Sequence, residues 1–151
     1  MDKFIIKVLG TIDKYNMVKE GQTVVMGISG GYDSMSMLYA LNEIRKIRHF
    51  DICAVHINHA FRDEADADCE YVKNVCEKLN IQFFGKKFDV ENYAKENKIS
   101  FETAGRDIRY AYFKEISQKF ENPVIATAHN ANDSIESFFI GNVLQLTIIP
   151  L

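Results

Sequence analysis

Short apolar, β-branched runs alternate with helix-like stretches along the chain, and this alternation constrains the fold more than any other feature. The runs predict strands at residues 23–28, 51–57, 81–88 and 124–127. The stretches predict helices at residues 2–18, 34–48, 65–79, 90–97 and 101–120, and one last helix that begins near Ala131. Strands that alternate with helices of this length indicate βαβ units. We therefore expect an α/β, Rossmann-like open parallel sheet with helices on both faces.

Helical periodicity also accounts for the cysteines. Cys69 and Cys76 stand in the apolar stripe of one predicted helix, where core residues are expected. With Cys53 they are odd in number and form no CxxC pair, which argues against a disulfide framework and against a zinc or iron–sulfur site. We expect buried, reduced thiols.

The length of 151 residues predicts a single domain that covers residues 1–151. Hydrophobic residues make up 47% and charged residues 26%, a balance typical of a folded globular chain. The N-terminus has no long apolar run or cleavage site, so we expect a cytoplasmic location and no membrane partner. A net charge of −3 argues against a protein that coats itself with nucleic acid, so any RNA contact must be local.

A glycine-rich loop, Ser-Gly-Gly-Tyr-Asp-Ser at residues 29–34, follows the first predicted strand and precedes a helix. Two glycines allow a tight turn that brings backbone amides up to an anion at a helix N-terminus. The loop lacks the Gly-Lys-Ser/Thr ending of the Walker A motif and the GxGxxG fingerprint. A pyrophosphate cradle is therefore favoured over a plain Gly-Gly turn.

This loop resembles the PP-loop of N-type ATP pyrophosphatases, which have an adenine nucleotide alpha hydrolase-like fold. The resemblance implies ATP and Mg²⁺ as cofactors, with Asp33 as the metal ligand. It assigns the pyrophosphate site to Ser29, Gly30, Gly31, Asp33 and Ser34.

Three further segments are similar to the tRNA(Ile)-lysidine synthetases within that superfamily. They are His-Ile-Asn-His-Ala-Phe-Arg at 56–62, Glu-Thr-Ala-Gly-Arg-Asp-Ile-Arg-Tyr at 102–110 and Ala-Thr-Ala-His-Asn-Ala-Asn-Asp-Ser-Ile-Glu-Ser at 126–137. The resemblance implies nucleotide binding by His56, Asn58, His59, Arg62 and His129.

Lysidine synthetases adenylate the wobble cytidine of an isoleucine tRNA and then let the amine of lysine displace AMP. The resemblance therefore implies ATP, free lysine and tRNA as partners. Asp33, Arg106, Arg109 and Asp133 are the expected catalytic residues, and Arg109, Asp133 and Glu136 are expected to hold lysine. These assignments also have purely structural alternatives. Arg106 and Arg109, for example, also fit an i, i+3 pair on the surface of a helix. The histidines also fit a metal site, but no carboxylate or Cys stands at a recognised spacing, so zinc ranks below ATP.

The chain departs from the family pattern near its end. Asn132 and Ser134 replace an Asp and a Gln, and residues 137–151 are uncharged. This tail is too short and too interrupted to span a bilayer, so it must be buried, promote aggregation or pair with another chain, as in a homodimer. The tRNA-binding regions expected of the family are missing from these residues, so the chain alone is expected to bind ATP at best. Three hypotheses stay open: an adenylating enzyme, a nucleotide-binding module without catalysis, and another PP-loop enzyme such as a tRNA thiolase.

Overall fold

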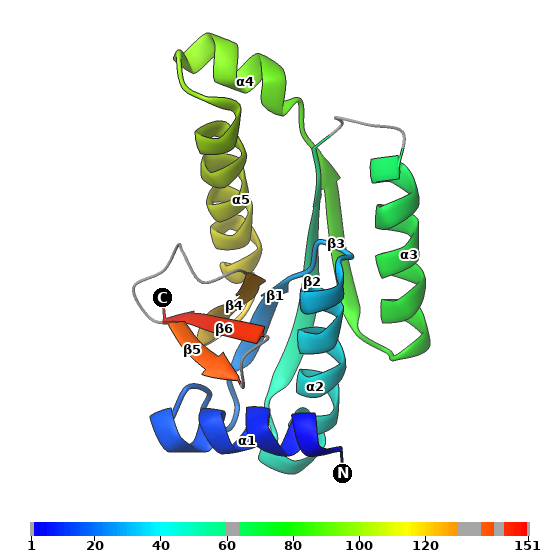
Figure 1. The fold of residues 1–151 in the computed structure, drawn as a ribbon, viewed down its shortest axis with the longest axis vertical. Helices are drawn as coiled ribbons and strands as arrows, with labels where there is room; N and C mark the ends of the chain where they lie inside the picture. The colour runs from blue at the N-terminus through cyan, green and yellow to red at the C-terminus, as the bar shows by residue number, and fades with distance from the viewer. Residues whose placement is uncertain (1, 60–63, 130–136, 141–143, 151) are drawn as a thin grey trace.

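The computed structural model describes residues 2–59, 64–129, 137–140 and 144–150 of the chain. Five helices and six strands lie within these residues (Figure 1). In chain order they are α1 (Lys3–Tyr15), β1 (Thr23–Gly27), α2 (Tyr32–Arg48), β2 (Asp51–Asn58), α3 (Glu64–Lys78), β3 (Gln82–Lys87), α4 (Val90–Asn97), α5 (Phe101–Ser117), β4 (Pro123–His129), β5 (Ser137–Ile140) and β6 (Leu144–Pro150). The elements predicted up to β4 are confirmed, with ends that shift by a few residues.

The strands form one six-stranded sheet in the order β3-β2-β1-β4-β6-β5. The first four in this order are parallel, as predicted. β6 pairs antiparallel with β4, and β5 pairs antiparallel with β6, which adds an antiparallel edge that was not predicted from the sequence.

The last predicted helix, which begins near Ala131, falls on residues 130–136 and lies outside the described residues. From Ser137 the backbone is strand. The run Leu-Thr-Ile-Ile at 146–149 is mostly β-branched, which favours a strand over a helix, and it pairs with residues 125–128 of β4. The uncharged tail was expected to be buried, to promote aggregation or to pair with another chain. In the structure its backbone pairs with the sheet of its own chain.

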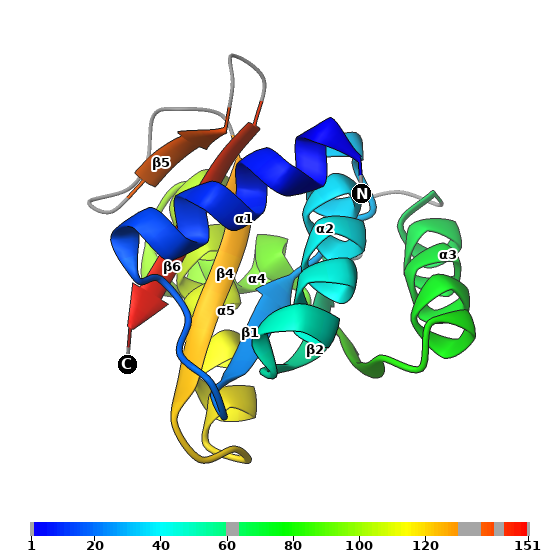
Figure 2. The ribbon, with the colours of Figure 1, turned by 90° about the horizontal axis from the view of Figure 1, so that it is seen from below.

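Alternate residues of the central strands enter two different cores, as the period of two requires. Val24 and Met26 of β1 belong to a cluster with α1, α2 and α3, whereas Val25 belongs to a cluster with α5. α4 packs on the N-terminal half of α5 in a third, smaller cluster. The sheet is thus covered on both faces, with α1 and α2 in front of it and α5 behind it in Figure 2.

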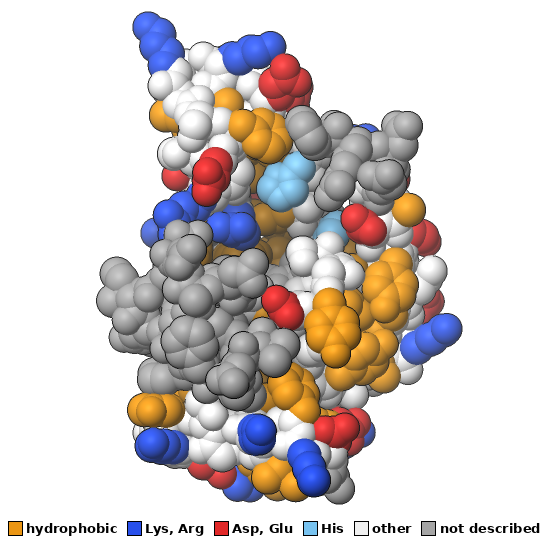
Figure 3. All heavy atoms as spheres, viewed as in Figure 1, with side chains coloured by type: hydrophobic (Ala, Val, Ile, Leu, Met, Phe, Trp, Pro, Cys, Tyr) orange, Lys and Arg blue, Asp and Glu red, His pale blue; other side chains and the backbone are white. Residues whose placement is uncertain are grey.

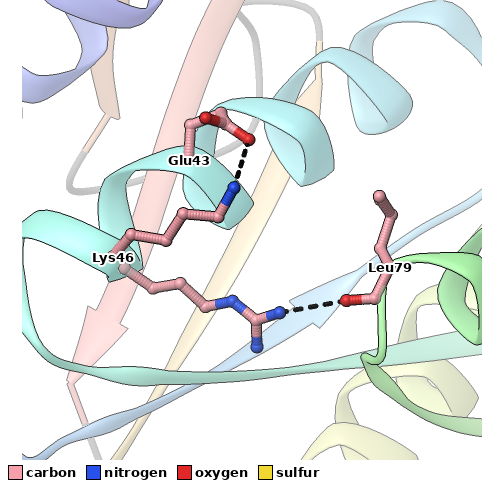
Figure 4. A network of polar contacts seen from close by, with 4 residues as sticks. Glu43, Lys46 and Leu79 are labelled. Atoms are coloured by element: carbon pink, nitrogen blue, oxygen red, sulfur yellow. Dashed lines mark hydrogen bonds and ion pairs between the residues drawn. The ribbon is translucent and has the colours of Figure 1, made fainter.

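The basic run at residues 45–48 is used in packing the helices. Arg45 donates to the carbonyl oxygen of Leu79 at 3.2 Å, and Lys46 pairs with Glu43 at 2.8 Å (Figure 4). Arg48 donates two hydrogen bonds to Asp13 of α1, at 3.0 and 2.6 Å, and these hold the pKa of that carboxyl below its usual value. The run therefore joins α2 to its neighbours. None of the helices in the described residues has the length and apolarity needed to cross a bilayer.

Candidate functional site

The glycine-rich loop at the end of β1 folds around a single buried hydroxyl. Ser34 Oγ accepts from the amides of Ser29 and Gly30, each at 3.2 Å, and donates to the carbonyl of Gly31 at 3.1 Å. The amide of Gly31 in turn donates to Ser29 Oγ at 3.2 Å. The sequence predicted that loop amides would face an anion, but these three amides have acceptors within the loop itself.

The N-terminus of α2 supplies the remaining anion-binding groups. Gly31 is the N-cap residue and makes no side-chain capping hydrogen bond. The amides of the first turn of an uncapped helix lack partners and carry the positive end of the helix dipole. Asp33 lies in this turn and is half-buried. The geometry therefore offers an anion site at the start of α2, with one carboxylate beside it.

Gly30 is required by the backbone of the loop. Its φ of +94° is one that L side chains rarely adopt, and a Cβ there would lie 3.4 Å from Cγ2 of Val72 on α3. Gly31 has an ordinary φ of −74°, and within the described part of the chain a Cβ there would meet only Ser29 Oγ, at 3.4 Å. The two glycines thus have different roles, the first in the turn and the second in keeping the loop open.

Two residues at the end of β2 hold the frame of the site. His56 is 3% exposed, and its Nδ1 lies 2.8 Å from the carbonyl oxygen of Ile28, so this nitrogen carries the proton. Asn58 is also buried and donates from Nδ2 to Asp66 of α3 at 2.6 Å. His56 therefore fastens β2 to the residue that precedes the loop. Both residues also line a pocket of ≈ 330 Å³ that reaches Ser29, His59 and Phe101.

Two buried polar atoms without partners converge on the groove beside the loop. Nδ1 of His59 and Nε of Arg109 are buried, and neither has a hydrogen-bond partner among the residues that the structure describes. Both side chains line a pocket of ≈ 410 Å³ with Arg106 and Glu102, and a smaller one of ≈ 100 Å³ with Ser29, Ser34 and Thr127. Because His59 lines all three pockets, they form one groove along the carboxyl ends of the strands. Figure 3 shows a hollow bordered by basic side chains and histidines.

The imidazole of His59 is held in its neutral form by its surroundings. Burial, followed by the charges of Arg109 and His56, lowers the pKa of His59 from its ordinary value. Gly105 of α5 lies against the ring, since a Cβ there would be in ordinary van der Waals contact with His59 Cε1 at 3.7 Å. An anion placed between His59 and Arg109 would offset the charge of Arg109 and satisfy both buried nitrogens.

The lowered pKa of His59 predicts a dependence of stability on pH. Below about pH 6.5, the ordinary value for histidine, the unfolded imidazole takes up a proton that the folded one resists. The free energy of unfolding should therefore fall as the pH drops from 6.5 to the folded pKa, and this contribution should be constant below it. Urea unfolding of wild type and His59→Gln between pH 5 and 8 measures the difference. His49→Asn, at an exposed helix end, should keep the wild-type slope, and an identical slope in His59→Gln would contradict the prediction.

The structure brings together part of the predicted site. Ser29, Ser34, His59 and Arg109 line one pocket, and Arg106 lies beside it with an exposed side chain. Arg62, Asp133 and Glu136 lie outside the described residues. The backbone of His129 ends β4, but its side chain is not among those described. The roles of these residues stay predictions.

Thr127 and Phe101 are among the lining residues that were not predicted from the sequence. Thr127 is 3% exposed and faces the loop pocket, where β4 lies in register with Gly27 of β1. The sequence feature that could have identified Thr127 is a polar side chain near the carboxyl end of a buried strand. Phe101 is 41% exposed and lines two of the pockets. Nothing in its sequence context distinguishes it from the apolar first residue of any helix.

Comparison with protein families finds that residues 3–145 match the PP-loop domain. Among individual proteins, the chain is similar to the tRNA(Ile)-lysidine synthase of Clostridium acetobutylicum, with 48% identity over 88% of this chain and 29% of that protein. The same enzyme of Petrotoga mobilis is 39% identical over 91% of this chain and 44% of that protein. The chain thus spans about a third of the length of the curated relatives it matches.

Two solved structures share the fold. The NH3-dependent NAD synthetase from Campylobacter jejuni aligns with a TM-score of 0.60 and 20% identity, over 83% of this chain and 56% of that one. The U34-tRNA thiolase NcsA from Methanococcus maripaludis, solved with its [4Fe-4S] cluster, aligns with a TM-score of 0.51 and 28% identity, over 57% and 29%. The first match, at this identity, bears on the fold alone.

Proposed function

The chain belongs to the PP-loop domain family, and we propose that it binds ATP with the triphosphate at the start of α2. The observation that carries the proposal is the pair of buried, unpartnered nitrogens of His59 and Arg109 in the groove beside the loop. Burying polar atoms without partners is costly, and such atoms are commonly satisfied by a ligand. An anion between the uncapped helix and these nitrogens would satisfy all of them.

The groove is divided in a way that suits a nucleotide. The triphosphate would lie between the first turn of α2 and Arg109, where positive charge offsets its own. The adenosine would lie in the ≈ 330 Å³ pocket beside His56, Asn58 and His59. Asp33 is the one proposed Mg²⁺ ligand of the chain, which fits the preference of this ion for one or two carboxylates together with phosphate oxygens. When bound, the ion would neutralise negative charge on the phosphates.

We further propose that the whole protein forms lysidine. The wobble cytidine oxygen would attack the α-phosphorus of ATP and release pyrophosphate, and the lysine amine would then displace AMP. Arg106 and Arg109 would offset charge that develops on the phosphates, and Asp133 and Glu136 would hold the lysine amine. The support is the 48% identity to a lysidine synthase, which extends over 29% of that relative. The same proposal includes recognition of tRNA, a cytoplasmic location, a single domain over residues 1–151 and a homodimer.

A nucleotide-binding module without catalysis is the second candidate, favoured by Asn132 and Ser134. They remove a carboxylate and an amide next to Asp133. Iron–sulfur cluster chemistry like that of the tRNA thiolase is disfavoured by the cysteines of this chain. The three cysteines form no CxxC pair. Burial raises the pKa of Cys53 to about 12 and that of Cys76 to about 11, so both are protonated, unreactive thiols at neutral pH.

Equilibrium binding and isotope exchange test the proposal together. Calorimetry should show that the chain binds ATP in the presence of Mg²⁺. ATP–pyrophosphate exchange and AMP release are then measured with an isoleucine tRNA transcript, with and without lysine. Lysine-dependent AMP release by the whole protein supports lysidine formation, whereas ATP binding without any exchange by the whole protein supports the binding module. Absence of ATP binding would contradict both.

A further inference from the structure

A second groove lies on the other side of α5 from the nucleotide groove. It has a volume of ≈ 370 Å³ and is formed by the residues that follow β3, by α4 and by α5. Its lining residues are Phe88, Asp89, Tyr93, Asp107, Ile108, Ala111, Tyr112 and Glu115. None of them lines the nucleotide groove. The volume falls in the range of small-molecule sites, and nothing in the proposed reaction uses it.

The walls of this groove are aromatic and its rim is acidic. Ile108 and Tyr112 form a buried floor, and Phe88 packs against Tyr112 with the ring centroids 5.5 Å apart. Asp107 and Glu115 are exposed at the rim. Among the described residues that line the groove there is no lysine or arginine. Aromatic faces and carboxylates both attract cations, so the groove favours a cation and repels phosphate.

A cation of the chain itself already lies against these rings. The ammonium of Lys86 is 5.2 Å from the centroid of Phe88 and 6.0 Å from that of Tyr112. This independent contact shows that the rings accept an ammonium. Asp89, Asp107 and Glu115 form no ion pair among the described residues. Asp89 is the N-cap residue of α4, and its carboxylate accepts from the amide of Asn92 at 3.0 Å. The carboxylates of Asp107 and Glu115 remain for a ligand, and these two negative charges match a dication.

The spacing of the carboxylates selects a linear ligand. Glu115 follows Asp107 by about two turns of α5, a rise of roughly 12 Å at 1.5 Å per residue. A single ammonium cannot reach both. Ala111 lies between them on the same stripe, and its small side chain leaves room for an alkyl stem. We propose that this groove binds an aliphatic diamine or polyamine, with its ammonium groups on the carboxylates and its stem on the rings.

Calorimetry of the 151-residue chain with 1,8-diaminooctane tests the assignment at constant ionic strength. The diamine should bind at least ten-fold more tightly than octylamine, which has the same stem and one charge. Asp107→Asn and Glu115→Gln should each weaken binding about five-fold, and Ala111→Leu should block it. Glu77→Gln, at an exposed position on α3, should bind as wild type.

The remaining outcomes decide against the proposal. Equal affinity for octylamine, or an equal loss in Glu77→Gln, would overturn it. So would tighter binding of a peptide with two lysines, because the groove would then be a docking site for a basic polypeptide. ATP is absent from every titration, so the result is independent of the nucleotide site.

Discussion

Replacing Gly27 with alanine is expected to destabilise the protein by about 2–3 kcal/mol, the upper part of the range for an overpacked core. A Cβ at this position would lie 2.5 Å from Cζ of Phe113, closer than real Cβ atoms approach. The ring cannot move aside easily, because Phe113 is 2% exposed and packs edge-on against Tyr110 at 5.9 Å. The strand cannot move either, because β1 is paired with both β2 and β4 at Gly27.

Urea unfolding of three variants measures this effect. Gly10→Ala is the matched control, since a Cβ on this helical glycine meets nothing within 4 Å, and it should stabilise the protein by up to about 1 kcal/mol. Adding Phe113→Leu to Gly27→Ala should restore part of the loss, because a smaller side chain relieves the contact. If Gly27→Ala proved as stable as Gly10→Ala, the close packing of β1 on α5 would be wrong.

Arg109→Met is expected to weaken ATP binding about 10- to 100-fold. A hydrogen bond to a charged group contributes roughly 1.5–3 kcal/mol, and each 1.4 kcal/mol corresponds to about ten-fold in affinity. Arg109 lines two of the three pockets of the groove, and its buried Nε has no hydrogen-bond partner among the described residues. Methionine keeps an apolar contact on the ring of Tyr110, over which the guanidinium now lies at 5.5 Å, but it removes the charge.

Calorimetric titration with ATP and Mg²⁺ measures the effect of the Arg109 change. Arg48→Met is the control, because Arg48 is paired with Asp13 between α1 and α2. It should leave the affinity for ATP unchanged. Circular dichroism and urea unfolding check that both variants are folded. Wild-type affinity in Arg109→Met would remove this residue from the site and leave the start of α2 as the main anchor for the nucleotide.

Local patterns predicted the elements and the loop. Periods of two and of 3.6 report which faces of a strand or helix are buried, and this information lies within a few residues. The strands β1 to β4, the helices α1 to α5 and the Ser29–Ser34 loop were therefore readable from the sequence. Resemblance to a family, rather than periodicity, suggested the roles of His59 and Arg109.

Only the tertiary structure decided which segments meet. It paired β6 antiparallel with β4. It also brought the ring of His59 against Gly105, although these residues lie far apart in the sequence. It also turned the loop amides of Ser29 and Gly30 toward Ser34 and formed two chemically opposite grooves on two sides of α5. Periodicity indicates that one face of a helix or strand is buried, but it does not indicate which other element covers that face. The partner depends on the path of the whole chain and on packing that no short stretch encodes.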